Sequence, residues 1–216
     1  MEYVISTWVY VNVFILVFTV FSYFRIRKKE SPISCIPLDI VRPETGDIVA
    51  FGQAGMRGRL VKIFSGTVWV HTGLVWRKRG EAYVVELARY DKKTGLQVIP
   101  FREWVQLHHF RPLGWLRTYA NIREEDFLSV LLKCVDVSIN EFLPGIWVKT
   151  FFKTERKCKH RTLSCNEFTI RLLQNLGVIE DRYCACCYTA KEIFFGQLPF
   201  KREIKPIPYV LDLEKI

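Results

Sequence analysis

Cys165 is the residue of this chain best placed to act as a nucleophile. It follows Ser164, and Glu167 comes three residues after that serine, a spacing typical of a capping box at a helix start. Phe168 and the leucines beyond it recur at helical spacing, so we expect a helix that begins at Cys165. The positive end of a helix dipole favours a thiolate. Capping boxes are common, however, and an ordinary buried cysteine would also fit this position.

A histidine and a glutamate occur upstream in segments with β-strand character. His71 lies in "VWVHTGLVW", where strand alternation puts it on one face with Trp69 and Gly73. Glu86 is the only acidic residue inside the apolar run "AYVVELA". Two polar side chains that point inward from adjacent strands usually satisfy each other. Together with Cys165 they form a set of nucleophile, base and orienting carboxylate. A hydrogen-bonded structural histidine and a glutamate at a strand end are the plain alternatives.

The order of the segments predicts an α+β domain. Strand-type runs come first and helical patterns follow, which favours an antiparallel sheet packed on helices on one side. His108 and His109 are interpreted as a turn that leads into a strand. The expected strands are 46–52, 67–78, 82–90, 96–101 and 109–119, with an edge strand within 201–213, and the expected helices are 123–140, 165–176 and 188–198.

The N-terminus has the composition of a membrane anchor. Residues 3–24 contain no charged side chain, and a helix of that length spans about 30 Å of hydrocarbon. The basic run 25–29 follows, so the positive-inside rule places the N-terminus outside and the rest of the chain on the cytoplasmic side. We therefore expect a single-pass membrane protein with an anchor over 1–29, a proline-containing linker over 30–45 and a globular domain over 46–216. A buried core helix is the alternative for the anchor.

The charge of the chain points to acidic partners. Its net charge is +10, part of it in the anchor flank and part in a second basic segment, 149–161. Beside a membrane we expect such a segment to bind anionic headgroups or an acidic protein, and a solvated loop is the alternative. Nucleic acid is not the expected partner.

The seven cysteines show no disulfide framework, which is typical of a reducing compartment. A structural zinc site made of Cys158, His160, Cys184 and Cys187 is an alternative use for some of them. Because paired Cys-x₂-Cys steps are absent, we expect free thiols and no cofactor.

The order of the motifs resembles a known family. "GDIVAFG", "VHTGLVW", "VVEL" and "LSCNEFTIRLLQNLGVI" are similar to the circularly permuted branch of the NlpC-type papain-like cysteine hydrolases, in which the histidine strand precedes the cysteine helix. That branch includes YiiX-like and poxviral proteins and is related to the lecithin:retinol acyltransferase-like enzymes. The resemblance covers roughly residues 43–193 and implies a permuted papain-like fold.

The resemblance also implies roles for single residues. Cys165 matches the nucleophile, His71 the base that maintains its thiolate, and Glu86 the residue that orients the imidazole. The oxyanion hole would use the backbone N–H of Cys165, with Gln53 or the Asn166 amide as candidates for the second donor.

The implied activity is that of a thiol hydrolase. It would cleave an amide, isopeptide or ester bond of a peptide or lipid acyl substrate through a thioester. The acyltransferase-like members carry Asn-Cys-Glu-His-Phe around the cysteine, whereas this chain has Ser164, Asn166 and Glu167 there, which favours the hydrolase-like members. A lipid acyltransferase or phospholipase, and a non-catalytic membrane adaptor, remain the alternatives.

Overall fold

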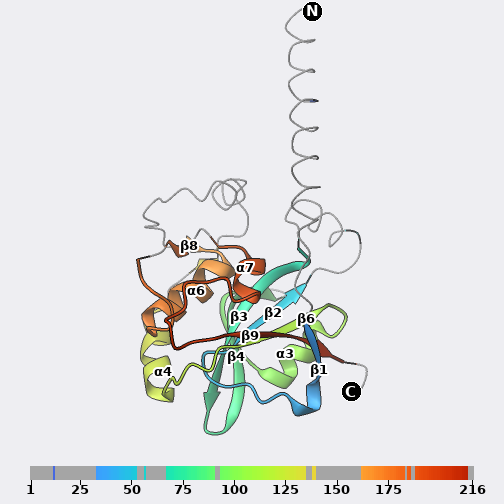
Figure 1. The fold of residues 1–216 in the computed structure, drawn as a ribbon, viewed down its shortest axis with the longest axis horizontal. Helices are drawn as coiled ribbons and strands as arrows, with labels where there is room; N and C mark the ends of the chain where they lie inside the picture. Colours follow the sequence, from blue (N-terminus) through green and yellow to red (C-terminus); the bar gives the residue numbers. More distant parts are fainter. Residues whose placement is uncertain are drawn as a thin grey trace, which may run out of the picture.

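The α+β class is confirmed by the computed structural model of the chain (Figure 1). The structure describes residues 12, 33–52, 56, 67–90, 93–134, 138–139, 162–182, 184–185 and 188–213. In this part of the chain one mixed sheet has the strand order β1-β9-β6-β2-β3-β4-β5. Its strands are β1 (Ser34–Pro37), β2 (Ile48–Gly52), β3 (Trp69–Lys78), β4 (Glu81–Tyr90), β5 (Lys93–Pro100), β6 (Leu113–Arg117) and β9 (Ile207–Asp212). The other elements are a 3-10 helix (Leu38–Ile40), α3 (Phe101–His108), α4 (Glu124–Leu132), α6 (Cys165–Asn175), α7 (Ala190–Phe194) and the short strands β7 (Ser138–Ile139) and β8 (Thr162–Leu163).

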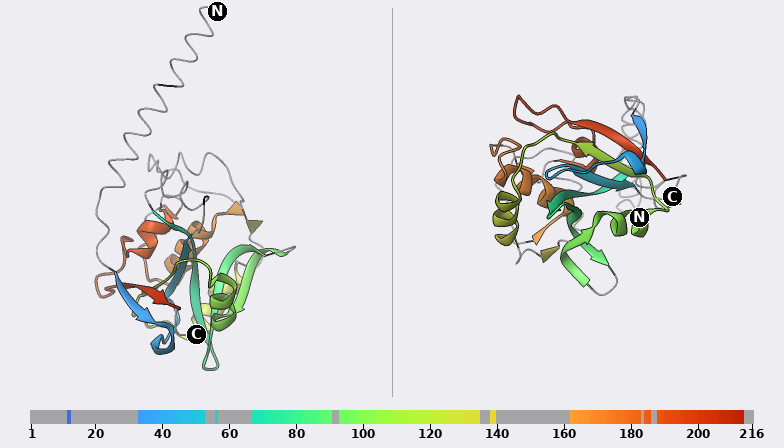
Figure 2. Two further views of the ribbon diagram at one scale, coloured as in Figure 1. Left: turned by 90° about the vertical axis from the view of Figure 1, so that its right-hand side faces the viewer. Right: turned by 90° about the horizontal axis from the view of Figure 1, so that it is seen from below.

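Helices cover both faces of the sheet, whereas the sequence predicted helices on one side only (Figure 2). Successive residues of a strand point to opposite faces. Leu74 belongs to the apolar cluster that contains residues of α4, α6 and α7, and its neighbour Val75 belongs to the cluster that contains residues of α3. The two faces of β3 therefore meet different helices.

Helix α3 was not predicted from the sequence. Phe101, Trp104, Val105 and His108 are buried at helical spacing along it, and Pro100 precedes its first turn. His108 is thus the last residue of a helix, with only 4% of its surface exposed. The interpretation of these two histidines as a turn before a strand was right for His109, which lies in the turn that leads into β6, and wrong for His108, whose burial with Trp104 and Val105 continues the helix through it.

The segment expected to be a linker, 30–45, contributes a strand to the sheet. β1 pairs in parallel with β9, with Ser34 opposite Tyr209. β9 therefore lies between β1 and β6, and it is not the edge strand expected within 201–213. An open edge on β9 would leave its backbone N–H and C=O groups unpaired, and β1 satisfies them.

The helix expected over 123–140 is shorter than the pattern indicated. α4 ends at Leu132, and β7 pairs in parallel with β8 just before the cysteine helix. The helix ends in a turn, because the backbone N–H groups of Lys133 and Cys134 donate to carbonyl oxygens three residues earlier. The predicted helices at Cys165 and within 188–198 are confirmed as α6 and α7.

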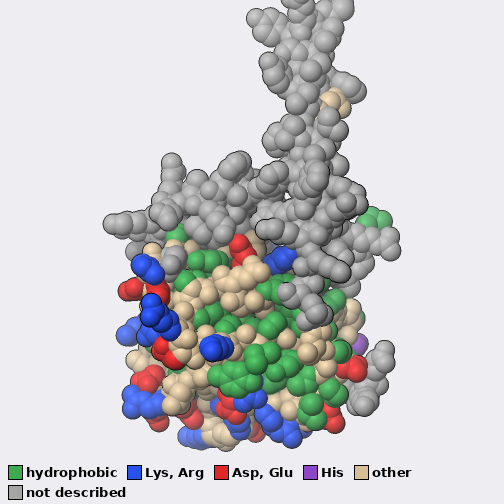
Figure 3. All heavy atoms as spheres, viewed as in Figure 1, with side chains coloured by type: hydrophobic (Ala, Val, Ile, Leu, Met, Phe, Trp, Pro, Cys, Tyr) green, Lys and Arg blue, Asp and Glu red, His purple; other side chains and the backbone are tan. Residues whose placement is uncertain are grey.

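Among the described residues, no helix is long and apolar enough to span a membrane. The expected anchor, 3–24, lies outside the described residues except for Asn12, and its basic flank, 25–29, and the basic segment 149–161 lie outside them entirely. On the described face seen in Figure 3, basic and acidic side chains are interspersed around a group of hydrophobic ones.

Candidate active site

His71 and Glu86 are hydrogen bonded across neighbouring strands. The Nε2 atom of His71, on β3, lies 2.8 Å from Oε2 of Glu86, on β4. The Glu86 side chain is fully buried, whereas 12% of the His71 side chain is exposed. The indole Nε1–H of Trp104 also donates to Oε2, at 3.1 Å, and the hydroxyl of Tyr90 donates to Oε1. Three donors therefore hold a carboxylate that would otherwise be costly to bury.

The lack of a side chain at Gly73, two residues after His71, leaves space for Glu86. A Cβ atom built on Gly73 would lie 3.0 Å from Cβ of Glu86 and 3.0 Å from Cγ1 of Val84. A side chain at this position would push Glu86 away from β3. The missing Cβ leaves the room in which His71 and Glu86 meet.

The cysteine helix is fixed to β3 by two threonines. Ser164 caps α6, its Oγ accepting from the backbone N–H of Glu167 at 3.2 Å. Thr169 Oγ1 lies 3.1 Å from the carbonyl oxygen of Cys165 and 3.3 Å from that of Thr72, so its hydroxyl hydrogen has an acceptor on either element. The first turn of α6 is thereby held against β3.

The glutamate of the predicted capping box forms an ion pair along the helix. Its Oε1 atom lies 2.7 Å from Nη2 of Arg171, one turn further along α6. The serine cap is thus present as predicted, and the Glu167 carboxylate stabilises the helix through an i,i+4 ion pair.

The thiol of Cys165 lies where two strands stop pairing. The ladder between β3 and β4 runs from Lys78–Glu81 to Leu74–Val85 and ends there, although each strand continues to pair with its other neighbour. Thr72 lies beyond the end of this ladder, and its backbone N–H helps to lower the pKa of the Cys165 thiol. Helix α6 contacts both strands and is hydrogen bonded to Thr72, so its first turn lies at this end of the ladder.

The charges of Cys165 and His71 support each other. Burial lowers the pKa of His71, but the negative charges of Cys165 and Glu86 and hydrogen bonds to both raise it to about 10. Burial raises the pKa of Cys165, but the charge and hydrogen bond of His71 and the backbone N–H groups of Thr72 and Asn166 bring it below its ordinary value. The arrangement therefore favours a thiolate–imidazolium pair at neutral pH.

Glu86 is ionised in this arrangement. Burial raises its pKa, whereas the positive charge and hydrogen bond of His71 and the hydrogen bonds of Tyr90 and Trp104 lower it, and the net result lies below the ordinary value. An ionised Glu86 can accept the Nε2–H of His71, which leaves Nδ1 of the same ring for the thiol.

Sequence reasoning missed Phe51 and His108. The Phe51 ring stacks on His71 at a centroid distance of 4.5 Å and on His108 at 4.1 Å. Nε2 of His108 lies 2.8 Å from the hydroxyl of Tyr90, which in turn contacts Glu86. Burial lowers the pKa of His108 to about 4, so its ring is neutral. The signal for His108 was its spacing of four residues from Trp104 on one helix face.

Asn166 is a neighbour of the candidate nucleophile. Its Oδ1 atom lies 3.6 Å from Sγ of Cys165 and accepts from Oγ1 of Thr72 at 3.1 Å. Those contacts leave the Nδ2 group of the amide for another acceptor. Gln53, the other candidate for an oxyanion donor, lies outside the described residues.

The described residues contain no group of three His, Cys, Asp or Glu side chains placed to hold a metal ion. Of the four residues in the zinc alternative, Cys184 is described, and it is partly buried. Cys158, His160 and Cys187 lie outside the described residues.

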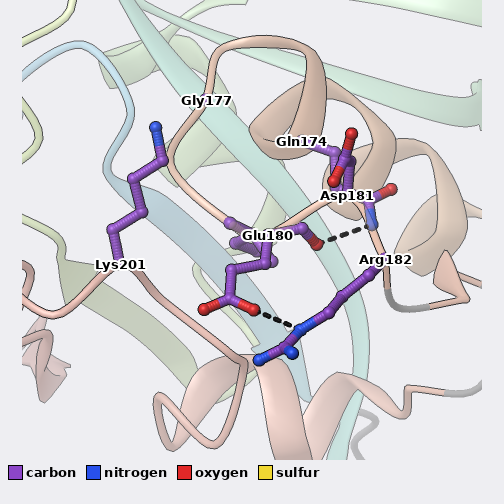
Figure 4. A pocket seen from close by; sticks show the side chains of 7 residues that line it. Gln174, Gly177, Glu180, Asp181, Arg182 and Lys201 are labelled. Carbon is purple, nitrogen blue, oxygen red and sulfur yellow. Dashed lines mark hydrogen bonds and ion pairs between the residues drawn. The ribbon is translucent and has the colours of Figure 1, made fainter.

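A surface pocket of about 540 Å³ lies at the opposite end of α6 from Cys165 (Figure 4). There Gln174 Nε2 donates to the carbonyl oxygen of Glu180, and Glu180 forms an ion pair of 2.5 Å with Arg182. No cysteine or histidine lines this pocket, so it lacks the nucleophile and base found at the start of α6. The lining residues are Gln174, Gly177, Ile179, Glu180, Asp181, Arg182 and Lys201.

The chain is similar to known proteins at the level of solved structures only. No family model matches the sequence, and no curated protein matches it. Among solved structures, the chain is similar to the metalloprotein YiiX from Escherichia coli O157:H7, with 16% identity and a TM-score of 0.45. The match covers 79% of this chain and 89% of YiiX. At this identity and TM-score the likeness concerns the overall path of the chain only.

Proposed function

We propose that the chain is a cysteine hydrolase with a circularly permuted papain-like fold, in which Cys165 is the nucleophile, His71 the general acid and base, and Glu86 the residue that orients His71. The observation that carries this proposal is the hydrogen bond between His71 and the buried Glu86 carboxylate, with Cys165 close enough to His71 for each group to shift the pKa of the other. Opposite pKa shifts in the cysteine and the histidine support it, because they provide a nucleophile and a proton donor together.

Acylation begins with attack of the Cys165 thiolate on the acyl carbonyl carbon. A sulfur–carbon bond forms, and the π electron pair of the carbonyl moves to its oxygen. When the tetrahedral intermediate collapses, the bond to the leaving nitrogen or oxygen breaks and His71 gives its proton to that atom. The product leaves with this proton, and the acyl group remains on Cys165 as a thioester.

Deacylation consumes one water molecule. Neutral His71 takes a proton from the water, whose oxygen attacks the thioester carbonyl. Collapse of the second tetrahedral intermediate breaks the sulfur–carbon bond, releases the acid product and returns the thiolate. His71 is protonated again, so the pair is restored for the next turnover.

The oxyanion of both intermediates has two candidate donors next to the sulfur. The backbone N–H of Cys165 is at the first position of α6, where it has no partner within the helix. The amide of Asn166 is the second, because a turn of this amide brings Nδ2 to the side of the sulfur on which Oδ1 now lies. Removal of one such donor typically costs about 10²–10³ in kcat.

The test of this function is the thioester itself. Purified full-length protein is mixed with 4-nitrophenyl acetate and quenched in acid, and the acetyl group is located by peptide mass spectrometry. We expect acetyl on Cys165 in the wild type, very little in His71→Ala and none in Cys165→Ala. Cys134→Ala is the matched control and should acetylate like the wild type. Acetylation that stays off Cys165, or that is unaffected in His71→Ala, would disprove the assignment.

We also propose that residues 3–24 anchor the enzyme in a membrane with its catalytic domain on the cytoplasmic side, and that segment 149–161 contacts an anionic surface. The uncharged run, the basic flank and the positive-inside rule support this arrangement. Alkaline carbonate extraction of membranes should leave the full chain in the pellet and release a chain that lacks residues 1–29. Release of both would contradict the anchor.

A further inference from the structure

The guanidinium of Arg111 lies over two aromatic rings. Arg111 follows α3, and its backbone N–H donates to the carbonyl oxygen of His108 at 2.9 Å. Its Cζ atom lies 4.8 Å from the centroid of the Phe51 ring and 4.9 Å from that of the Phe110 ring. Aromatic faces stabilise a planar cation that lies over them. Because the guanidinium is already ordered there, it loses less conformational entropy when it binds a partner.

This guanidinium has no acidic partner among the described residues. Other arginines of the domain are paired, such as Arg77 with Glu44 at 3.0 Å and Arg171 with Glu167 at 2.7 Å. The five N–H donors of Arg111 make no hydrogen bond or ion pair with any described side chain, although the residue is half-buried. An arginine that is ordered by stacking and left without an anion has the features of a binding group.

Arg111 is separated from the candidate base, His71, by one aromatic ring. The Phe51 ring that its guanidinium covers is the ring stacked on His71. The hydroxyl of Tyr90 is close enough to both Arg111 and Cys165 for each charge to act on its pKa, which Arg111 lowers and Cys165 raises. A group bound to Arg111 would therefore lie across the Phe51 ring from His71, on the path to the proposed nucleophile.

We propose that Arg111 binds a carboxylate of the acyl substrate, next to the bond that Cys165 attacks. This inference rests on the proposed hydrolase function. The planar fork of a guanidinium matches the two oxygens of a carboxylate. One guanidinium supplies a single positive charge, and no second cationic side chain accompanies it on the Phe51 and Phe110 rings in the described part of the chain, which suits a singly charged carboxylate better than a phosphate. The enzyme would then prefer acyl substrates with an acidic group close to the scissile bond.

The preference is measured with two alkylating reagents that differ only in charge. Iodoacetate carries a carboxylate where iodoacetamide carries a neutral amide, and both alkylate a thiolate by the same reaction. The rate constants at Cys165 are determined by peptide mass spectrometry at low ionic strength, and the ratio of the iodoacetate to the iodoacetamide rate constant is compared among variants. We expect Arg111→Gln to lower this ratio by about two- to tenfold, the range that Coulomb attraction gives at roughly 10 Å near a protein surface.

The controls separate the charge of Arg111 from a general effect. Arg102→Gln removes an exposed positive charge from α3 and should leave the ratio as in the wild type. Arg111→Lys keeps a positive charge, so its ratio should lie between those of the wild type and Arg111→Gln. Added salt should lower the ratio in the wild type and have less effect in Arg111→Gln.

Equal ratios in the wild type, Arg111→Gln and Arg102→Gln would overturn the carboxylate site. That result is distinct from failure of the proposed function, in which Cys165 would react with iodoacetamide no faster than Cys134 in the wild type. The reactivity of Cys134 in each variant also reports whether the fold is retained, and if Arg111→Gln does not fold, the comparison of Arg111→Lys with the wild type decides.

Discussion

The Nε2 atom of His71 lies 2.8 Å from the Oε2 atom of Glu86, and this carboxylate is fully buried. Because Nε2 is committed to Glu86, the other ring nitrogen, Nδ1, is the one available to the Cys165 thiol. The carboxylate also offsets the cost of placing a positive charge on a largely buried imidazole. One contact between neighbouring strands thus sets both the orientation and the charge of the candidate base.

The first prediction concerns the pH dependence of the two proposed catalytic groups. The pKa of Cys165 is lowered by His71, so the iodoacetamide rate at Cys165 should reach half its maximum below pH 9.0, the ordinary pKa of the group. The rate should fall as the pH drops through the pKa that Cys165 has in the folded protein. Loss of the His71 charge removes the lowering effect, so His71→Ala should move the midpoint upward. A midpoint unchanged in His71→Ala would contradict the pairing.

The rate of hydrolysis should also fall at alkaline pH, whereas the rate of alkylation should not. Leaving-group protonation needs the imidazolium of His71, whose pKa is raised to about 10. Hydrolysis of an amide substrate should therefore decline as the pH rises through about 10, while alkylation of the thiolate stays at its plateau. Parallel decline of both rates would show that the alkaline limit is unfolding and not loss of this proton.

The second prediction uses two buried tryptophans. Trp104 donates its indole N–H to Glu86, whereas the indole nitrogen of Trp76 has no hydrogen-bond partner. Both side chains are at most 5% exposed, so replacement by phenylalanine removes similar packing. Trp104→Phe should cost about 1–3 kcal/mol more in the free energy of unfolding, because a buried charged acceptor loses a donor. Chemical denaturation should show lower stability for Trp104→Phe than for Trp76→Phe, and alkylation of Cys165 should be slower in Trp104→Phe. Equal stability and equal alkylation rates would refute the role of Trp104 in holding Glu86.

The third prediction compares two tyrosines on β4. The Tyr90 hydroxyl contacts Glu86 and His108, whereas that of Tyr83 contacts Glu81 at the surface, at 2.8 Å. Tyr90→Phe should weaken the hold on Glu86 and reduce kcat, with a cost of about 1–2 kcal/mol in the free energy of unfolding. Tyr83→Phe should change neither quantity measurably. If the two variants have equal kcat, Tyr90 does not position Glu86.

The fourth prediction tests the space at Gly73. Gly73→Ala places a methyl group 3.0 Å from Cβ of Glu86 and from Cγ1 of Val84. Overpacking of this kind typically costs about 1–3 kcal/mol. The displaced Glu86 should also lower the alkylation rate at Cys165. Val84→Ala removes one of the two close contacts, so Gly73→Ala should cost less stability in a Val84→Ala background than in the wild type. A variant with wild-type stability and reactivity would show that Glu86 does not need this space.

The elements that carry the candidate site followed from local sequence patterns. Cys165 at a helix start, and His71 and Glu86 on strands, could be predicted because helix caps and strand alternation depend on residues close in the chain. Tyr90 lies four residues after Glu86 on the same side of β4, and Trp104 and His108 share a helix face. The sequence shows those spacings. Which carboxylate the Tyr90 and Trp104 side chains contact depends on how α3 packs on the sheet, and the local pattern does not contain that information.

Long-range pairing was beyond the reach of the sequence patterns. β1 and β9 pair across most of the chain, and their prolines and short length indicated a linker and an edge instead. The helices on both sides of the sheet escaped prediction for a related reason. Strand residues that alternate only in part indicate covered faces, without saying which segment covers each.

The most direct test of the account compares two thiols in one molecule. Burial raises the pKa of Cys134, whereas His71 and two backbone N–H groups lower that of Cys165. Full-length protein is treated at neutral pH with limiting iodoacetamide, and the initial rate at each cysteine is measured by quantitative peptide mass spectrometry. We predict that Cys165 reacts far faster than Cys134 and the other cysteines, and that His71→Ala abolishes this difference. Equal rates at Cys165 and Cys134 in the wild type would contradict the proposal that Cys165 is the nucleophile.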